Sequence, residues 1–300
     1  MNLPKVTVIM RSKNSEWVIG QSLIALFSQN YSDFDLIVVD SGSTDGTIQI
    51  VEKFPANIIK IEGKDYFPAD VLNMAIERTE GEIIVFQNSD AVPLIPTALE
   101  KILGAFQDKK VVAAFARQIP RPEAERWVKR EYRSCFPDSK NPPSWITLSL
   151  PFSAMRKDAW RQHHFYSDSW GSEDTEWGYW AKKNNFKVKY VKDALVMHSH
   201  NYSLPQIYGR KFIEGEADAF IYRDNYTLSK AVKQFCGAVL KDFLAAGKDL
   251  SIKEICKAPI RRFVHFWAYY KARKFGKKRI LLKTRDRKRA QQEILNRYEK

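Results

Sequence analysis

The sequence predicts an α/β fold with a mostly parallel sheet, followed by a C-terminal basic helical extension. Short apolar runs alternate with segments of helical spacing through the first half of the chain, which is typical of strands joined by crossover helices. Charge also divides the chain, because residues 251–300 hold 17 Lys and Arg against 4 Asp and Glu and so carry +13 of the net charge of +14. The two parts therefore need separate explanations.

Strands are expected wherever a short apolar run stops at a polar cluster. The run Val6–Met10 is followed by the polar segment Arg11–Asn14, and Leu36–Val39 stops at Asp40. Runs of this kind suit strands that are buried on both faces of a parallel sheet. The expected strands are Val6–Met10, Leu36–Val39, Ile58–Ile61, Ile83–Phe86, Val111–Arg117, Val188–Val191 and a short one at Leu195–Met197.

Helices are expected between these strands. Ser43, Thr44 and Asp45 supply side chains that favour a helix N-terminus, while prolines make the stretch from about Gln118 to Pro151 less regular. The expected helices are Trp17–Phe27, Ser43 to about Phe54, Asp70–Arg78, Pro96–Phe106, Glu123–Tyr132, Thr175–Asn184 and Leu204–Asn225. We place the domain boundary after residue 225, so that residues 1–225 form the α/β domain and residues 226–300 form the extension.

Composition excludes several classes of protein. With 44% hydrophobic and 13% aromatic residues the chain can bury a core, which excludes intrinsic disorder. Cys135, Cys236 and Cys256 form no CxxC pair, so neither a disulfide framework nor a structural zinc site is expected. No run approaches the roughly 20 apolar residues of a membrane-spanning helix. We expect a cytoplasmic protein.

Acidic clusters follow two of the expected strands. In a parallel sheet, ligands bind beyond the carboxyl ends of the strands, where Asp40 and Asp90 both lie. The turn from Asp40 to Thr47 can present backbone N–H groups to an anion, and it is equally typical of an ordinary helix cap. Asp90 follows the strand Ile83–Phe86, where a carboxylate can bind a divalent cation, although a turn-forming role before Pro93 also explains it.

A third cluster, Trp170–Gly178, contains the adjacent carboxylates Glu173 and Asp174 at the start of an expected helix. One carboxylate can act there as a base while its neighbour binds a hydroxyl group, or both can simply favour the helix N-terminus. Trp170 and Trp177 flank the pair, and their flat apolar faces suit stacking on sugar rings. The cluster therefore indicates a carbohydrate site.

Two of the five histidines stand at the end of an expected strand. His198 and His200 are two residues apart, so both side chains project to one side of an extended chain. Because a neutral imidazole suits Mn²⁺, we expect one of them, His198, to contact a metal ion or a diphosphate, with backbone hydrogen bonding as the alternative. His163 and His164 are expected on the surface.

In this order and spacing, the clusters resemble the family 2 inverting glycosyltransferases of GT-A fold over roughly residues 5–225. Val39–Thr47 matches the nucleotide-binding signature of that family, and Glu173-Asp174 matches its acidic pair. The family's DxD-type metal motif reads Asn88-Ser89-Asp90 here, which retains one firm carboxylate. The rhamnosyltransferase-like subset is also similar at Asp90–Pro93, Arg117–Pro122 and His198–Ser203.

The resemblance implies transfer of a sugar, with inversion, from a nucleoside-diphosphate sugar to a carbohydrate hydroxyl, with Mn²⁺ or Mg²⁺ as cofactor. Asp174 would be the catalytic base, and Glu173 would orient the acceptor together with Trp170 and Trp177. Asp90 and His198 would bind the metal. The nucleotide sugar would be held by Arg11, Asp40, Ser43, Asn73, Ser89 and Asp90.

The donor implied by the rhamnosyltransferase-like subset is dTDP-rhamnose, whereas Trp170–Gly178 also resembles the acidic loop of galactosyl- and N-acetylhexosaminyl-transferases, which implies a UDP-hexose or UDP-N-acetylhexosamine. Two other classes stay open. The single carboxylate of Asn88-Ser89-Asp90 permits a catalytically inactive binding module. A nucleotidyltransferase is less favoured, because no Gly-rich triphosphate loop stands near the N-terminus.

The extension interleaves cations with Phe263, Phe266, Trp267, Tyr269 and Tyr270. A basic aromatic helix suits the anionic inner face of the cell membrane, so a peripheral location and a lipid-linked glycan acceptor are expected. Packing in a homo-oligomer is the second interpretation. Nucleic acid is not expected as a partner, because the nearly neutral first part contains no recognisable nucleic-acid module.

Overall fold

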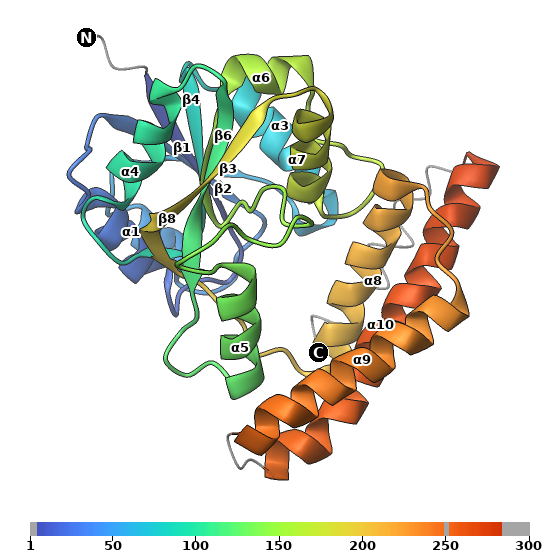
Figure 1. Cartoon of the computed structure of the whole chain (residues 1–300). Coiled ribbons are helices and arrows are strands. Elements are labelled where there is room, and N and C mark those ends of the chain that lie inside the picture. The colour runs from blue at the N-terminus through green and yellow to red at the C-terminus, as the bar shows by residue number, and fades with distance from the viewer. Residues whose placement is uncertain (1–4, 249–251, 284–300) are drawn as a thin grey trace. The chain divides into compact units, whose positions relative to one another are not determined.

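The computed structural model describes residues 5–248 and 252–283, which form two compact units (Figure 1). The first unit comprises the chain up to Tyr166 together with Glu173–His200, and the second comprises Ser167–Ser172 together with the chain from Asn201 onward. Part of the expected basic extension, residues 249–251 and 284–300, lies outside the described residues.

The first unit is built on one eight-stranded sheet with the order β3-β2-β1-β4-β7-β6-β8-β5. Parallel pairing joins β1 to β2 and β4, β2 to β3, and β6 to β8, which confirms the predicted α/β fold with a mostly parallel sheet. The strands are β1 (Val6–Ser12), β2 (Phe34–Asp40), β3 (Asn57–Lys60), β4 (Ile83–Asn88), β5 (Val92–Pro93), β6 (Val111–Ile119), β7 (Phe152–Arg156) and β8 (Lys187–Met197).

Both faces of this sheet are buried. Val8 and Met10 of β1 join a core cluster with apolar residues of α1 and α4, whereas Ile9 joins a second cluster with residues of α3 and α7. Burial on both faces explains why the strand runs are continuously apolar. The helices of this unit are α1 (Ile19–Phe27), α2 (Thr47–Val51), α3 (Pro68–Glu77), α4 (Ala98–Gly104), α5 (Arg126–Cys135), α6 (Lys157–Gln162) and α7 (Glu173–Lys183), with 3₁₀ turns at Gly63–Asp65 and Ala105–Gln107.

The sheet contains two strands that the sequence did not predict, the two-residue β5 and the longer β7. β7 pairs antiparallel with both β4 and β6, so it runs in the opposite direction to both of its neighbours. Its sequence begins directly after Pro151 and is only five residues long, which made it look like part of the irregular segment. The two short strands expected at Val188–Val191 and Leu195–Met197 are one strand, β8, which is interrupted by a register shift opposite Ala116 and Arg117.

The second unit contains the helices α8 (Leu204–Tyr222), α9 (Leu228–Lys248) and α10 (Ile252–Leu282). α8 and α10 pack closely through glycines: a Cβ atom on Gly276 would lie 2.7 Å from Ala219 Cβ, and one on Gly215 would lie 2.7 Å from the Tyr269 carbonyl oxygen. α8 therefore belongs with α10, and the unit begins near residue 201 rather than at the expected boundary after residue 225. Within residues 5–248 and 252–283, none of the helices has the length and apolar character needed to span a bilayer.

Candidate active site

The loop after β2 is shaped by Asp40. The ends of β1 and β2 are paired, with Ser12 opposite Asp40. The buried carboxylate of Asp40 accepts hydrogen bonds from Ser12 Oγ at 2.9 Å, Ser43 Oγ at 2.5 Å, and the backbone N–H groups of Gly42 and Ser43 at 3.1 and 2.9 Å. Gly42 has a φ of +80°, which glycine adopts without a steric penalty. Direct contact of Asp40 or Ser43 with a nucleoside stays a prediction.

The loop after β1 is connected to the acidic pair by an ion pair. Arg11 Nη1 lies 2.9 Å from Oε1 of Glu173, the first residue of α7, and also donates to the Tyr66 hydroxyl at 3.4 Å. Burial opposes the charge of Arg11, but Tyr66 and Glu173 together hold the pKa of the guanidinium above its usual value. Arg11 and Glu173 thus fix the start of α7 to the end of β1, and a direct contact of either with substrate stays a prediction.

Asp174 follows Glu173 in the first turn of α7. Its carboxylate accepts a hydrogen bond from the Thr175 backbone N–H at 2.7 Å, and its side chain is half-buried. A carboxylate at this position is favoured by the partial positive charge of the helix N-terminus. Glu173 pairs directly with Arg11, whereas Asp174 accepts hydrogen bonds from the backbone and the hydroxyl group of Thr175 and adds to the negative charge around Arg11.

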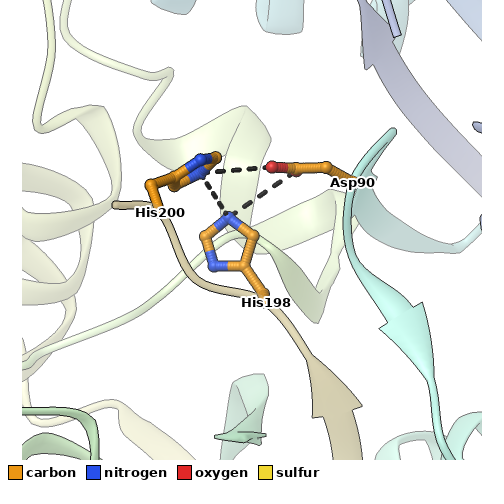
Figure 2. A group of neighbouring side chains, drawn as sticks. All are labelled: Asp90, His198 and His200. Carbon is orange, nitrogen blue, oxygen red and sulfur yellow. Dashed lines mark hydrogen bonds and ion pairs between the residues drawn. The ribbon is translucent and has the colours of Figure 1, made fainter. Parts of the chain in front are cut away.

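Asp90, His198 and His200 form a cluster of possible metal ligands (Figure 2). His200 Nε2 lies 3.1 Å from Asp90 Oδ2, His198 Nε2 lies 3.6 Å from Asp90 Oδ1, and the two Nε2 atoms are 3.2 Å apart. One ligand atom from each residue lies within 4.8 Å of the others. Antiparallel pairing of β5 with β8, with Val92 opposite Met197, brings these distant parts of the sequence together.

The ring of His198 is held from behind by Gln118. His198 Nδ1 lies 2.8 Å from Gln118 Oε1, and the same amide donates through Nε2 to Ser149 Oγ at 2.7 Å. With Nδ1 donating to this oxygen, Nε2 of His198 presents its lone pair towards Asp90 and His200. One carboxylate and two imidazoles form a donor set that suits Mn²⁺ or a similar divalent cation, so the residues present fit the implied cofactor. His200 joins the predicted ligands Asp90 and His198.

Two further side chains hold the loop that carries Asp90. Ser89 Oγ lies 2.8 Å from Ser15 Oγ, which ties the loop after β4 to the loop after β1. Arg121 Nη2 donates to the backbone carbonyl of Asp90 at 2.7 Å, while its guanidinium lies 4.8 Å from the centroid of the Trp17 ring. The sequence did not identify Gln118 or Arg121 as site residues, because a strand pattern does not show which side chains face the next loop. The similarity of Arg117–Pro122 to rhamnosyltransferases was the one available signal.

Two predicted site residues, Asn73 and Trp177, form hydrogen bonds within the first unit. Asn73 on α3 accepts hydrogen bonds from Trp160 Nε1 at 2.9 Å and from the Phe165 N–H at 3.0 Å, and it donates to the Phe165 carbonyl at 2.9 Å. Trp177 is fully buried on α7, with its Nε1 donating to the His163 carbonyl at 2.8 Å. The structure therefore corrects the prediction of Trp177 as a sugar platform, because its ring is fully buried, whereas the contact of the half-buried Asn73 with a nucleotide stays a prediction.

Of the two histidines expected on the surface, His164 is exposed and His163 is partly buried. His163 Nε2 lies 2.9 Å from Glu176 Oε2, and its ring stacks on Trp180 with the ring centroids 4.6 Å apart. These contacts hold the middle of α7 against the chain that follows α6. Trp170 belongs to the second unit, so its stacking on a sugar stays a prediction.

Comparison with known structures supports the fold. The mannosyltransferase PcManGT of Pyrobaculum calidifontis, solved with GDP-Man and Mn²⁺, has a TM-score of 0.64 at 18% identity and covers 92% of this chain and 87% of its own. TarS of S. aureus in complex with UDP-GlcNAc has a TM-score of 0.54 at 18% identity, covering 93% and 92%. At these identities the likeness shows a GT-A type of fold.

Comparison of sequences shows the family. The O-antigen chain rhamnosyltransferase RfbN of Salmonella typhimurium is 26% identical over 224 residues, or 70% of this chain and 71% of that protein. The O-antigen chain rhamnosyltransferase WbaN of Salmonella anatum is 29% identical over 228 residues, or 71% and 72%. Residues 7–172 match the model of "Glycosyl transferase family 2". Since this match spans more than half of the chain, the protein belongs to glycosyltransferase family 2, as a member similar to the rhamnosyltransferases.

Proposed function

We propose that the protein transfers a sugar, with inversion, from a nucleoside-diphosphate sugar to a hydroxyl group of a growing, lipid-linked cell-surface polysaccharide. The donor is a dTDP-rhamnose or a UDP-hexose type of sugar nucleotide. The observation that carries this proposal is the cluster of Asp90, His198 and His200 beyond the carboxyl ends of the strands, where GT-A enzymes act on their donor. The similarity to RfbN and WbaN, which are O-antigen chain rhamnosyltransferases, supports the polysaccharide acceptor.

The proposed reaction needs one base and one means of stabilising the leaving group. Asp174 takes the proton of the acceptor hydroxyl while the oxygen of that hydroxyl attacks the anomeric carbon, and the bond from that carbon to the diphosphate oxygen breaks with its electron pair. A divalent cation held by Asp90, His198 and His200 would offset the charge that develops on the leaving diphosphate. Glu173 is a positioning residue in this scheme, because Arg11 binds its carboxylate.

A panel of nucleotide sugars tests the proposal directly. The full chain is incubated with each sugar nucleotide and Mn²⁺, with and without a lipid-linked oligosaccharide, and release of nucleoside diphosphate is measured. We expect one donor class to be turned over, faster with acceptor, and chelation to abolish release. No release with any donor would favour an inactive binding module, and release of pyrophosphate from a nucleoside triphosphate would favour a nucleotidyltransferase.

The base is tested by comparing the two adjacent carboxylates. Asp174→Asn should lower turnover at least about 100-fold, within the range for loss of a general base, while nucleotide binding is retained. Glu173→Gln keeps the shape of the side chain but weakens the ion pair with Arg11, so its effect on turnover should be smaller. Near-normal turnover of Asp174→Asn together with a large loss in Glu173→Gln would exchange the two roles.

A further inference from the structure

The arginines of α10 are bound inside the second unit. Arg261 and Arg262 contact the Asp242 carboxylate at 3.1 and 2.8 Å, and Arg273 and Arg279 form ion pairs with Asp224 and Glu216. The side chains of Arg261, Arg273 and Arg279 are at least nine-tenths buried. These cations stabilise the helical unit, so only part of the basic charge of the extension is available to a partner.

Seven exposed residues form one continuous face of α10. The spacing of Ile252, Ile260, Phe263 and Trp267 places them on one side of the helix, and they are 78%, 58%, 56% and 42% exposed. The same spacing continues with three exposed lysines. We refer to this face as the α10 stripe, which consists of Ile252, Ile260, Phe263, Trp267, Lys271, Lys274 and Lys278.

The stripe differs from the surface expected from the sequence. Phe266 packs against His265, Tyr269 donates a hydrogen bond to Asp218 at 2.5 Å, and Tyr270 is 9% exposed. Phe266 and Tyr269 are half-buried and Tyr270 is buried, so all three are less exposed than the aromatic residues of the stripe. Phe263 and Trp267 lie on the exposed face, and their rings stack with centroids 6.2 Å apart.

The charge of the α10 stripe and the order of its side chains indicate which kind of partner it binds. The apolar half of the stripe is followed by the basic half, and the single acidic residue between Ile252 and Leu282, Glu254, is 8% exposed. The two halves meet where Lys271 Nζ lies over the Trp267 ring, 5.8 Å from the ring centroid. A helix face with aromatic and aliphatic side chains beside lysines that form no ion pair within residues 5–248 and 252–283 complements an anionic lipid surface, where the apolar side chains enter the headgroup region and the lysines contact phosphate.

We propose that the α10 stripe is the surface by which this protein binds anionic lipid, with Ile252 to Trp267 at headgroup depth and Lys271 to Lys278 on lipid phosphates. The proposal rests on the proposed function, because a lipid-linked acceptor is what makes membrane attachment useful. It assigns binding to one face of one helix, and it excludes the buried arginines and Phe266, Tyr269 and Tyr270 from that role.

Co-sedimentation of the full chain with vesicles tests the assignment. The vesicles contain phosphatidylcholine alone or with about one-third phosphatidylglycerol, and we expect binding to the anionic set that weakens with salt. Replacing Lys271, Lys274 and Lys278 with Gln should weaken that binding about 100-fold, since each lysine near an anionic surface contributes about fivefold. A control with the same loss of charge replaces three exposed lysines of the first unit, Lys53, Lys101 and Lys109.

The apolar half is tested separately. Phe263→Ala with Trp267→Ala should weaken binding at least about tenfold even at high salt, whereas Trp145→Ala with Ile24→Ala, which are 60% and 61% exposed in the first unit, should not. All variants should release nucleoside diphosphate at the rate of the unaltered chain when no vesicle is present.

Equal binding by the lysine variant and its control would overturn the assignment. So would absence of vesicle binding by the unaltered chain, or a change of oligomeric mass in the Phe263 and Trp267 variant without a change in vesicle binding. If the unaltered chain released no nucleoside diphosphate, that result would contradict the proposed function and not the assignment of the α10 stripe.

Discussion

Asp90 of the first unit has different surroundings from Glu216 and Asp242 of the second unit. In the second unit Glu216 is fully buried beside Arg279, and Asp242 is bound by Arg261 and Arg262. Burial raises the pKa of Asp242, but the two guanidinium groups hold it below its usual value. In the first unit Asp90, with 14% of its side chain exposed, faces the imidazoles of His198 and His200. A carboxylate paired with arginine contributes to packing, whereas the carboxylate beside two imidazoles belongs to a group of possible metal ligands.

The largest effect on activity is expected when the charge of Asp90 is removed. Asp90→Asn should lower turnover by about 1,000-fold, because charge stabilisation by a bound metal contributes several kcal/mol to the transition state. Mn²⁺ affinity, measured by calorimetry, should fall in parallel. Asp193→Asn, at an exposed position of β8, is the matched control and should change neither quantity. Unchanged Mn²⁺ affinity in Asp90→Asn would remove Asp90 from the metal site.

Changes to the arginine-bound carboxylates of the second unit should alter the free energy of unfolding and leave Mn²⁺ affinity unchanged. Arg279→Met removes the guanidinium that pairs with the fully buried Glu216, so the free energy of unfolding should fall by about 3–5 kcal/mol. Combining it with Glu216→Leu should recover most of this loss, because no buried charge then stays uncompensated. Urea unfolding measures both variants, and Mn²⁺ affinity should be unchanged in the double variant. A single variant as stable as the unaltered chain would show that solvent reaches Glu216.

The sequence predicted the regular parts of the first unit well, because continuous apolar runs, turn residues and strand ends are local signals. It placed Asp90 and His198 at strand ends, but only the pairing of Val92 with Met197 shows that they meet. Trp177 was assigned to the wrong environment because its position after the acidic pair does not show which side of α7 faces the core. The inward arginines and outward lysines of α10 were equally hidden, since composition gives charge without direction.

A further prediction concerns Gln118, which orients His198 and does not contact the carboxylate of Asp90. Gln118→Leu removes the acceptor for His198 Nδ1, so the ring loses its orientation and Mn²⁺ affinity should fall about 10- to 100-fold. Gln118→Glu retains an acceptor oxygen and should restore most of the affinity. Mn²⁺ titration separates this positioning role from a loss of folding, which circular dichroism would detect. Affinity that is equal in Gln118→Leu and the unaltered chain would leave Gln118 as a packing residue.

Asp218 gives the smallest and most specific effect, because it is a carboxylate of the second unit that arginine compensates only in part. Burial raises the pKa of Asp218 to about 6, and the negative charge of Glu214 acts in the same direction. The hydrogen bond from Tyr269 and the positive charges of Arg273 and Lys211 lower the pKa in part. An acid with a higher pKa in the folded than in the unfolded chain binds its proton more tightly when folded. Asp218 therefore lowers the free energy of unfolding as the pH rises from about 4 to about 6, and the loss persists above that range.

Asp218→Asn removes this titration while keeping an oxygen that accepts from Tyr269. The variant should melt a few degrees higher than the unaltered chain at pH 8, and the difference should shrink towards zero as the pH falls through about 6 to about 4. Thermal unfolding followed at several pH values measures it, with Asp193→Asn as the exposed control. A difference that is the same at pH 4 and pH 8 would mean that the amide acts through packing rather than through the missing charge. A variant less stable at pH 8 would mean that Arg273 and Lys211 already compensate Asp218 fully, which would place it with Glu216 and Asp242 among the neutralised carboxylates.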